Sequence, residues 1–159
     1  MNYIQIVDGK AYIPKSEILN IEIEDRFKFK KDFIKSRTGI EKRYYAINES
    51  IEEMAVKAVE KIDIDKLQDV EMIIVATTSS NNAMPGISNQ IQKYFKITKC
   101  ICLDIFAGCG GFINAIDIAK IYIETGRINK ALVVGVDKLS KTIDTNDLGT
   151  MAVLADGAG

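Results

Sequence analysis

The sequence predicts an α/β fold built on one mostly parallel, helix-covered sheet. Two observations carry this prediction: short apolar runs alternate with longer amphipathic segments, and a run such as Met72–Ala76 is apolar at every position. Strands covered by helices on both faces have this composition. Strands separated by helices are joined by right-handed crossovers, which place them side by side and parallel in one sheet.

Four segments have the composition of strands. They are Tyr3–Val7, Met72–Ala76, Ile101–Phe106 and Ala131–Val136. The first is followed by Asp8-Gly9, a dipeptide typical of turns.

Three segments are predicted helices. Ser50 and Glu53 form a capping box before the first helix, and Pro85 opens the second. The third helix covers Gly110–Glu124, with Gly126 where a C-terminal glycine is favoured. The apolar positions expected to face the core are Ile51, Met54, Ala55, Ala58, Val59 and Ile62; then Ile87, Ile91 and Phe95; then Phe112, Ala115, Ile116, Ala119 and Ile123.

Two regions depart from this regular alternation. Residues 8–49 show no clean period, so they are predicted to be an insertion between the first strand and the first helix. The chain stops in the glycine-rich turn of residues 155–159, and natural domains seldom finish within a turn. We therefore expect residues 1–159 to be one α/β domain whose second, C-terminal half is absent.

Composition narrows the class of protein. The 159 residues are 47% hydrophobic and 27% charged, with a net charge of −1, which gives no overall attraction to nucleic acid or membrane. No apolar run approaches the roughly 20 residues that cross a bilayer. The first residues lack the basic segment of a signal peptide. These features predict a cytoplasmic protein with neither a nucleic-acid nor a membrane partner.

Cys109 is the candidate catalytic residue, because it lies at a turn from a predicted strand into a predicted helix. The positive end of a helix dipole favours thiolate over thiol. The adjacent Gly108, Gly110 and Gly111 permit a sharp turn, and the Cys109 amide could help to hold an oxyanion. The alternative is a small residue packed at a crowded turn. The chain contains no histidine, the usual base, so Cys109 resembles half of an active site.

Two other readings of this region are less favoured. The dinucleotide-binding pattern would begin at Gly108 and Gly110, but its third glycine falls on Ile113. Cys100 and Cys102, together with Cys109, could ligate a metal, but the chain offers no histidine as a fourth ligand. We predict no metal site and expect Cys100 and Cys102 to pack on one face of a strand in a reducing compartment.

Residues 26–43 form a basic segment with a net charge of +6, whereas the rest of the chain carries −7. Aromatic residues are interleaved with the basic ones or lie next to them. A solvated face explains many such runs, but this density on an irregular segment favours an anionic partner: ligand phosphates, an acidic protein or, less favoured, RNA. The basic residues are Arg26, Lys28, Lys30, Lys31, Lys35, Arg37, Lys42 and Arg43.

Five motifs occur in an order that resembles the N-terminal half of β-ketoacyl-[acyl-carrier-protein] synthase III. The motifs are Ser-Arg-Thr-Gly-Ile-Glu-Lys-Arg at 36–43, Ala-Thr-Thr-Ser at 76–79, Gly-Cys-Gly-Gly-Phe at 108–112, Leu-Val-Val-Gly at 132–135 and Asp-Gly-Ala-Gly at 156–159. The resemblance covers the whole chain. It implies a thiolase-like fold of two similar α/β halves, usually in a homodimer.

The resemblance also implies a reaction of fatty acid biosynthesis. The family's cysteine, matched by Cys109, accepts an acyl group from acyl-CoA, and the acyl-enzyme condenses with malonyl-acyl-carrier-protein as CO2 leaves. The thioester is a substrate, and no cofactor is implied. The family's histidine and asparagine belong to the C-terminal half, so this chain alone is expected to be inactive.

Other roles are implied by position within the resemblance. Phe33 matches a tryptophan that stacks on the CoA adenine, Arg37 matches an arginine near the CoA phosphates, and Gly149 is assigned to the same CoA site. Leu148 stands where an arginine often completes the adenine clamp. Met84 matches a residue that reaches the partner subunit's acyl pocket.

Two alternatives remain open. One is another acyl-CoA condensing enzyme of the thiolase superfamily, for instance one like 3-hydroxy-3-methylglutaryl-CoA synthase. The other is a non-catalytic, half-length partner subunit.

Overall fold

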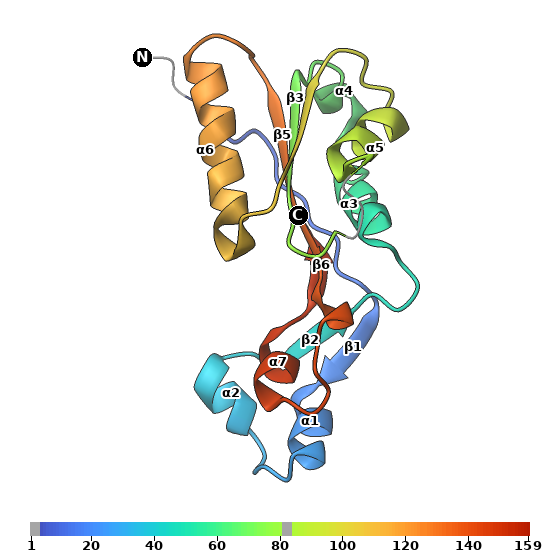
Figure 1. The fold of residues 1–159 in the computed structure, drawn as a ribbon, viewed down its shortest axis with the longest axis vertical. Coiled ribbons are helices and arrows are strands. Elements are labelled where there is room, and N and C mark those ends of the chain that lie inside the picture. Colours follow the sequence, from blue (N-terminus) through green and yellow to red (C-terminus); the bar gives the residue numbers. More distant parts are fainter. Residues whose placement is uncertain (1–3, 81–83) are drawn as a thin grey trace.

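A mixed four-stranded sheet with helices on both faces forms the main body of the protein (Figure 1). The computed structural model describes residues 4–80 and 84–159. The strands are β3 (Met72–Ala76), β4 (Ile101–Ile105), β5 (Ala131–Lys138) and β6 (Asp156–Ala158), in the order β4-β3-β5-β6. The helices are α3 (Ile51–Val59), α4 (Ile64–Leu67), α5 (Ile87–Tyr94) and α6 (Gly111–Glu124).

Strand β3 is the centre of the sheet. It runs parallel to β4 and to β5, with Met72 opposite both Ile101 and Ala131. All five of its residues are buried. Helices α3 and α5 cover one face of the sheet and α6 covers the other (Figure 1). The predicted parallel, helix-covered sheet is confirmed, and the antiparallel strand β6 extends it beyond β5.

Local sequence signals explain where the helices begin and end. The Ser50 hydroxyl accepts a hydrogen bond from the Glu53 amide at 3.1 Å, and the Ser50 amide donates to the Glu53 carboxylate at 2.7 Å. This is the capping box predicted from the sequence. Gly126 has a φ of 70° just past α6, as a residue that ends a helix in the left-handed region does.

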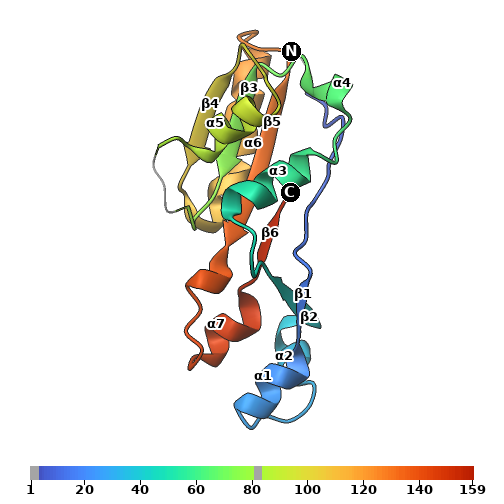
Figure 2. The same ribbon diagram turned by 90° about the vertical axis from the view of Figure 1, so that its right-hand side faces the viewer.

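A second, smaller lobe lies below the main body (Figure 2). It contains β1 (Ser16–Leu19), α1 (Asn20–Arg26), α2 (Phe33–Thr38), β2 (Lys42–Tyr45) and α7 (Leu148–Val153). Strands β1 and β2 pair antiparallel, with Ser16 opposite Tyr45. Ile23, Ile34 and Ala152 form the buried centre of this lobe. The stretch 8–49, which shows no clean period, therefore holds elements of four to seven residues, too short to give a periodic signal.

The first predicted strand does not form where it was expected. Tyr3 lies outside the described residues, and residues 4–7 are in no strand. Ile6 is 81% exposed and Val7 66% exposed, so pairing here would bury little apolar surface. Pairing begins later, where Tyr12 forms an isolated bridge with Ala158. Within the described ranges, no helix is long and apolar enough to cross a membrane.

Replacing the helix cap tests the energetic role of the capping box. Ser50→Ala removes the hydroxyl that accepts from the Glu53 amide, so we expect the free energy of unfolding to fall by about 1 kcal/mol. Urea titration followed by circular dichroism measures the change. Thr98→Ala, at an exposed residue between α5 and β4, is the control. Equal losses in the two variants would contradict the role given to this cap.

Candidate functional site

Cys109 lies in a one-turn 3-10 helix, Gly108–Gly110, that joins β4 to α6. Its side chain is exposed. Of the three flanking glycines, only Gly108 requires glycine for its backbone, because its φ is +57°. Gly111 is buried against the end of β3: a Cβ there would lie 3.4 Å from the Ala76 Cβ, which is ordinary van der Waals contact, so this position could hold a small side chain.

A pocket of about 270 Å³ opens beside Cys109. It lies at the carboxyl ends of the parallel strands, where α/β proteins commonly bind their ligands. The walls are Ala76, Thr77, Gly108, Cys109, Phe112, Gly135, Val136, Asp137 and residues 157–159. The 14-residue helix α6 starts at this pocket with no acidic side chain in its first turn, so the positive end of its dipole is not offset locally.

The predicted burial of Phe112 is wrong. It was predicted to be buried, but its side chain is 40% exposed and forms part of the pocket wall. The cause is its place in the first turn of α6, where the ring lies against Gly135. A Cβ at Gly135 would be only 3.0 Å from the Phe112 ring, so glycine makes this close approach possible.

Asp137 holds the turn that forms another wall of the pocket. Its Oδ1 accepts hydrogen bonds from the Thr78 amide at 2.7 Å, from the Thr78 and Ser79 hydroxyls at 2.9 Å each, and from the Thr77 hydroxyl at 3.3 Å. The Ser79 hydroxyl in turn accepts from the Lys138 amide at 2.7 Å. These bonds fasten the end of β3 to β5. Asp137 was not predicted from the sequence to have a role. Two features of the sequence pointed to it: the hydroxyl side chains of residues 77–79, directly after β3, and an acidic residue near the end of β5.

The other two cysteines differ chemically from Cys109. Both are half-buried, and Cys102 lies on β4. Burial, and then the hydrogen bond with Cys100, raises the pKa of the Cys102 thiol to about 12. Cys102 is therefore protonated at neutral pH. Among the described residues, no three His, Cys, Asp or Glu side chains converge as metal ligands would.

The residues predicted to bind CoA lie in the smaller lobe. Phe33 and Arg37 are one turn apart on α2, and Gly149 is in the first turn of α7, where its amide donates to Asp147. Phe33 and Leu148 pack on the same apolar cluster, so the fold brings these distant parts of the sequence together.

Phe33 is already stacked within the chain. The Phe29 ring lies nearly parallel to it, with centroids 4.2 Å apart, and the Arg37 guanidinium lies over it at 4.6 Å. Both neighbours lie against the Phe33 ring, so a planar base that stacks where either of them lies would have to displace it.

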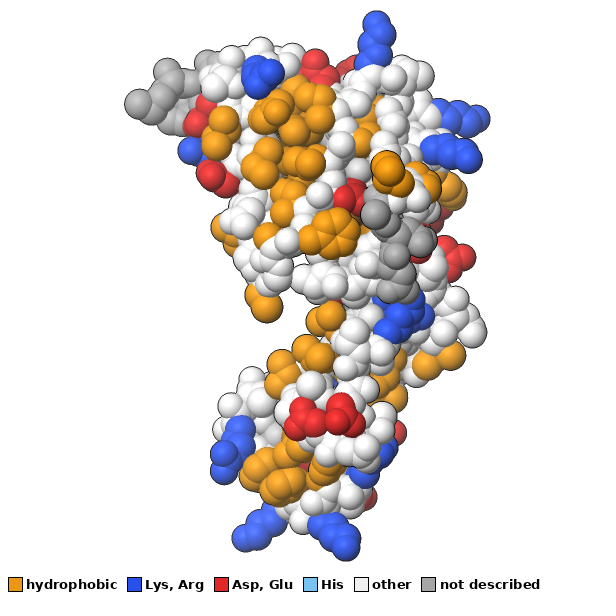
Figure 3. Space-filling model, viewed as in Figure 1, with side chains coloured by type: hydrophobic (Ala, Val, Ile, Leu, Met, Phe, Trp, Pro, Cys, Tyr) orange, Lys and Arg blue, Asp and Glu red, His pale blue; other side chains and the backbone are white. Residues whose placement is uncertain are grey.

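The fold places some side chains of the basic segment, residues 26–43, in buried or ion-paired positions and leaves the others exposed. Arg43 is buried and donates to Asn20, while Lys42 pairs with Glu17 and Lys35 with Glu41, each at 2.7 Å. The remaining basic side chains are exposed, and cationic groups gather at the free end of the smaller lobe (Figure 3). These remaining residues are Arg26, Lys28, Lys30, Lys31 and Arg37.

Buried Glu24 shapes the loop that carries three of these lysines. It is 1% exposed and accepts hydrogen bonds from the Asp32 and Ile34 amides. Lys28 and Asp32 take left-handed φ values of 57° and 66° in this loop. Glu24, two positions before the basic segment, was not predicted from the sequence to have a role, because its burial depends on the contacts of the folded loop.

Met84 is 89% exposed at the start of the segment that leads into α5. The three residues before it lie outside the described chain. Within α5, the first-turn amides of Ile87 and Ser88 donate to Asp104 of β4.

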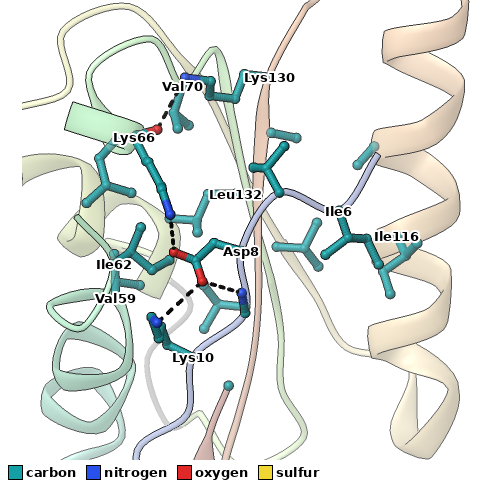
Figure 4. A pocket seen from close by; sticks show the side chains of 18 of the residues that line it. Ile6, Asp8, Lys10, Val59, Ile62, Lys66, Val70, Ile116, Lys130 and Leu132 are labelled. Atoms are coloured by element: carbon teal, nitrogen blue, oxygen red, sulfur yellow. Dashed lines mark hydrogen bonds and ion pairs between the residues drawn. The ribbon is translucent and has the colours of Figure 1, made fainter. Parts of the chain in front are cut away.

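A second cavity has a volume of about 310 Å³, and Cys109 is not among the residues that line it. It lies between the N-terminal segment, β5 and α6, and its lining is largely apolar (Figure 4). At its edge Asp8 pairs with Lys66 at 2.7 Å and with Lys10 at 3.5 Å. These contacts attach the N-terminal segment to α4, and the Lys66 hydrogen bond lowers the pKa of Asp8.

Alkylation distinguishes the three thiols. With iodoacetamide at neutral pH, we expect Cys109 to react faster than Cys102 by on the order of tenfold or more, because Cys109 is exposed and Cys102 is held protonated. Peptide mass spectrometry over time measures each rate, and Cys109→Ala identifies the fast site. Similar rates at all three thiols would contradict the assignment of Cys109.

Asp137 permits a test with a matched variant. The bonds from residues 77–79 all use Oδ1, which the side-chain oxygen of Asp137→Asn can replace, whereas Asp137→Ala leaves the Thr78 amide without its acceptor. We expect the Ala variant to lose roughly 1–3 kcal/mol of stability and the Asn variant less. Denaturant titration and hydrogen exchange at the Thr78 amide measure this. Equal exchange in both variants would contradict the anchoring role.

Comparisons with known proteins agree with this architecture. A family model described as 3-Oxoacyl-[acyl-carrier-protein (ACP)] synthase III matches residues 103–159. The beta-ketoacyl-[acyl-carrier-protein] synthase III of Salmonella typhimurium is 39% identical over 99% of this chain and 51% of its own length. That of Serratia proteamaculans is 37% identical over the same shares.

Solved structures give the same result. The synthase III of Thermus thermophilus matches 96% of this chain and 49% of its own, with a TM-score of 0.88 and 34% identity. That of Aquifex aeolicus matches 94% and 50%, with a TM-score of 0.87 and 32% identity. The chain spans about half the length of these relatives. It is thus a relative of the β-ketoacyl-[acyl-carrier-protein] synthase III proteins over nearly its whole length, with their thiolase-like fold, as its motifs predicted.

Proposed function

We propose that Cys109 is the acyl-accepting nucleophile of a ketosynthase III-type acyltransferase that initiates fatty acid biosynthesis. The observation that carries the proposal is the placement of an exposed thiol at the start of α6, inside a pocket at the carboxyl ends of β3 and β5. The relatives, which bear the name of this enzyme, support it. The whole domain, residues 1–159, is proposed to act as one half of a two-half enzyme.

The first half-reaction is acyl transfer. The Cys109 thiolate attacks the carbonyl carbon of an acyl-CoA, the tetrahedral intermediate collapses, and the CoA thiolate leaves. The positive end of the α6 dipole favours both the attacking thiolate and the oxyanion. Phe33, Arg37 and Gly149 are proposed to contact CoA, with Arg37 near its phosphates.

The second half-reaction is condensation. Malonyl-acyl-carrier-protein loses CO2, and the resulting carbanion attacks the acyl group on Cys109, which gives a 3-oxoacyl product and restores the thiolate. This step needs groups that stabilise the carbanion. The chain has no histidine, so we propose that a complementary half supplies them and that the chain alone does not complete the reaction.

The same proposal covers partners and location. We propose a homodimer in the cytoplasm that acts on acyl-CoA and acyl-carrier-protein, without a cofactor. The outer edge of β4, where Ile101 is 45% exposed and Phe106 beyond it 58% exposed, supports a subunit contact. Exposed Met84 is proposed to reach the partner's acyl pocket.

A second candidate is another acyl-CoA condensing enzyme of the thiolase superfamily. Its support is the stack of Phe29 and Arg37 on Phe33, together with Leu148 in place of the arginine that the resemblance leads one to expect. The third candidate, a non-catalytic partner subunit, has the absence of histidine from these 159 residues in its favour.

Intact-protein mass spectrometry tests the nucleophile. After incubation with acetyl-CoA or longer acyl-CoAs, we expect one acyl adduct that maps to Cys109 and is absent from Cys109→Ala. The relative adduct yields give the preferred primer. With malonyl-acyl-carrier-protein added, we expect no 3-oxoacyl product from this chain alone.

Each contrary result has a definite meaning. No adduct on folded protein with any acyl-CoA overturns acyl-CoA as the acyl donor and favours the third candidate. An adduct on Cys100 or Cys102 overturns the assignment of Cys109. A 3-oxoacyl product from the chain alone overturns the requirement for a complementary half.

A further inference from the structure

Cys100 and Cys102 form a pair of thiols at the start of β4. Their Sγ atoms are 3.7 Å apart, which places both side chains on one face of the strand. Both are half-buried. Cys109 follows the other end of β4, so the proposed reaction does not involve this pair.

We propose that Cys100 and Cys102 are a modification site: a dithiol that closes to an intramolecular disulfide by exchange with a low-molecular-weight disulfide. The proposal does not depend on the proposed function. It replaces the expectation that these residues only pack.

The backbone at this point allows the two sulfurs to approach. A disulfide needs a sulfur separation of about 2.05 Å, so the atoms must close by less than 2 Å. Cys102 is fixed within the ladder, opposite Ile73. Cys100 precedes the first strand residue, Ile101, and so can move without breaking the β3–β4 pairing.

The chemistry balances with glutathione disulfide as the oxidant. The Cys100 thiolate attacks one sulfur of glutathione disulfide and releases one glutathione, which leaves a mixed disulfide on Cys100. Cys102 loses its proton to solvent and attacks the Cys100 sulfur, so the second glutathione leaves as a thiolate and takes up a proton. The protein loses two hydrogen atoms, and one glutathione disulfide is reduced to two glutathiones.

Such a bridge would be easily reversed. The two cysteines are only two positions apart, so the disulfide closes a small ring and is strained. A strained disulfide is more readily reduced than a relaxed one. The pair therefore suits reversible modification better than a permanent cross-link. Both thiols are half-buried, but the raised pKa of Cys102 keeps it protonated, which leaves Cys100 as the first thiol to react.

Closure of the disulfide would affect helix α5. Cys102 Sγ lies 3.4 Å from the Gln92 side-chain oxygen and 3.8 Å from the Ser88 carbonyl oxygen. Two residues further along the same face of β4, Asp104 accepts from the amides of Ile87 and Ser88. Closure turns the Cys102 sulfur toward Cys100 while the Cys102 backbone stays in the ladder, so its contacts with Ser88 and Gln92 of α5 change.

The test uses the full chain with Cys109→Ala, so that the only thiols are the pair. The protein is equilibrated with glutathione and glutathione disulfide at several ratios, acid-quenched and weighed by intact-protein mass spectrometry. We expect a species lighter by two hydrogens, with peptides that link Cys100 to Cys102, and full reversal by dithiothreitol. The additional variant Cys102→Ser is the matched control and should give only a glutathione adduct on Cys100.

The proposal is overturned if folded Cys109→Ala protein, which keeps both Cys100 and Cys102, stays reduced or carries only glutathione adducts at every ratio. Phenylarsine oxide, which bridges two nearby thiols with loss of water, gives an independent measurement. We expect one arsenical per chain in Cys109→Ala and none that survives washing in Cys109→Ala/Cys102→Ser. Equal retention by both variants would also overturn the proposal.

Discussion

The burial of β3 on both faces is the constraint on which the rest of the structure depends. A five-residue strand with no exposed side chain needs helices on each side and a strand at each edge. Because β4 and β5 run parallel to it, the carboxyl ends of all three strands meet at one edge. That edge holds Thr77, Cys109 and Asp137, so the position of the candidate site follows directly from the packing of the central strand.

Carboxylates that accept hydrogen bonds from backbone amides join segments that the sheet itself does not connect. Asp156 is 7% exposed and accepts from the amides of Ala46 and Ser140, at 2.7 Å each, which ties the smaller lobe's β2 to the end of β5. Asp104 joins β4 to α5, and Glu24 closes the loop between α1 and α2. An unpaired buried amide is costly, so each acid fixes a junction that hydrophobic packing does not specify.

The sequence allowed the main body to be predicted but not the smaller lobe. A wholly apolar run identified β3, and the Ser50–Glu53 pair located the start of α3, because both signals are local; the end of α3, at Val59, falls before the predicted position Ile62. The smaller lobe depends on contacts between residues more than 100 positions apart, such as Ile34 with Ala152, which no local period reveals. Cys109 was found from its glycine-rich turn, whereas Asp137 was missed because its role exists only when β3 and β5 are paired.

The smaller lobe shows why matched motif positions do not by themselves fix a binding mode. At the position matched to a base-stacking tryptophan, this chain has Phe33, and its own Phe29 and Arg37 lie against the ring. Stacking and cation–π contacts of this kind contribute about 0.5–1.5 kcal/mol each at partly exposed sites, so a ligand must offset that loss before it gains anything from the ring. Cys109 and its pocket rest on the buried sheet and do not share this cost. The proposed acyl transfer to Cys109 and the proposed recognition of the donor's carrier are therefore assigned to different lobes, so variants in one lobe test one proposal without altering the residues of the other.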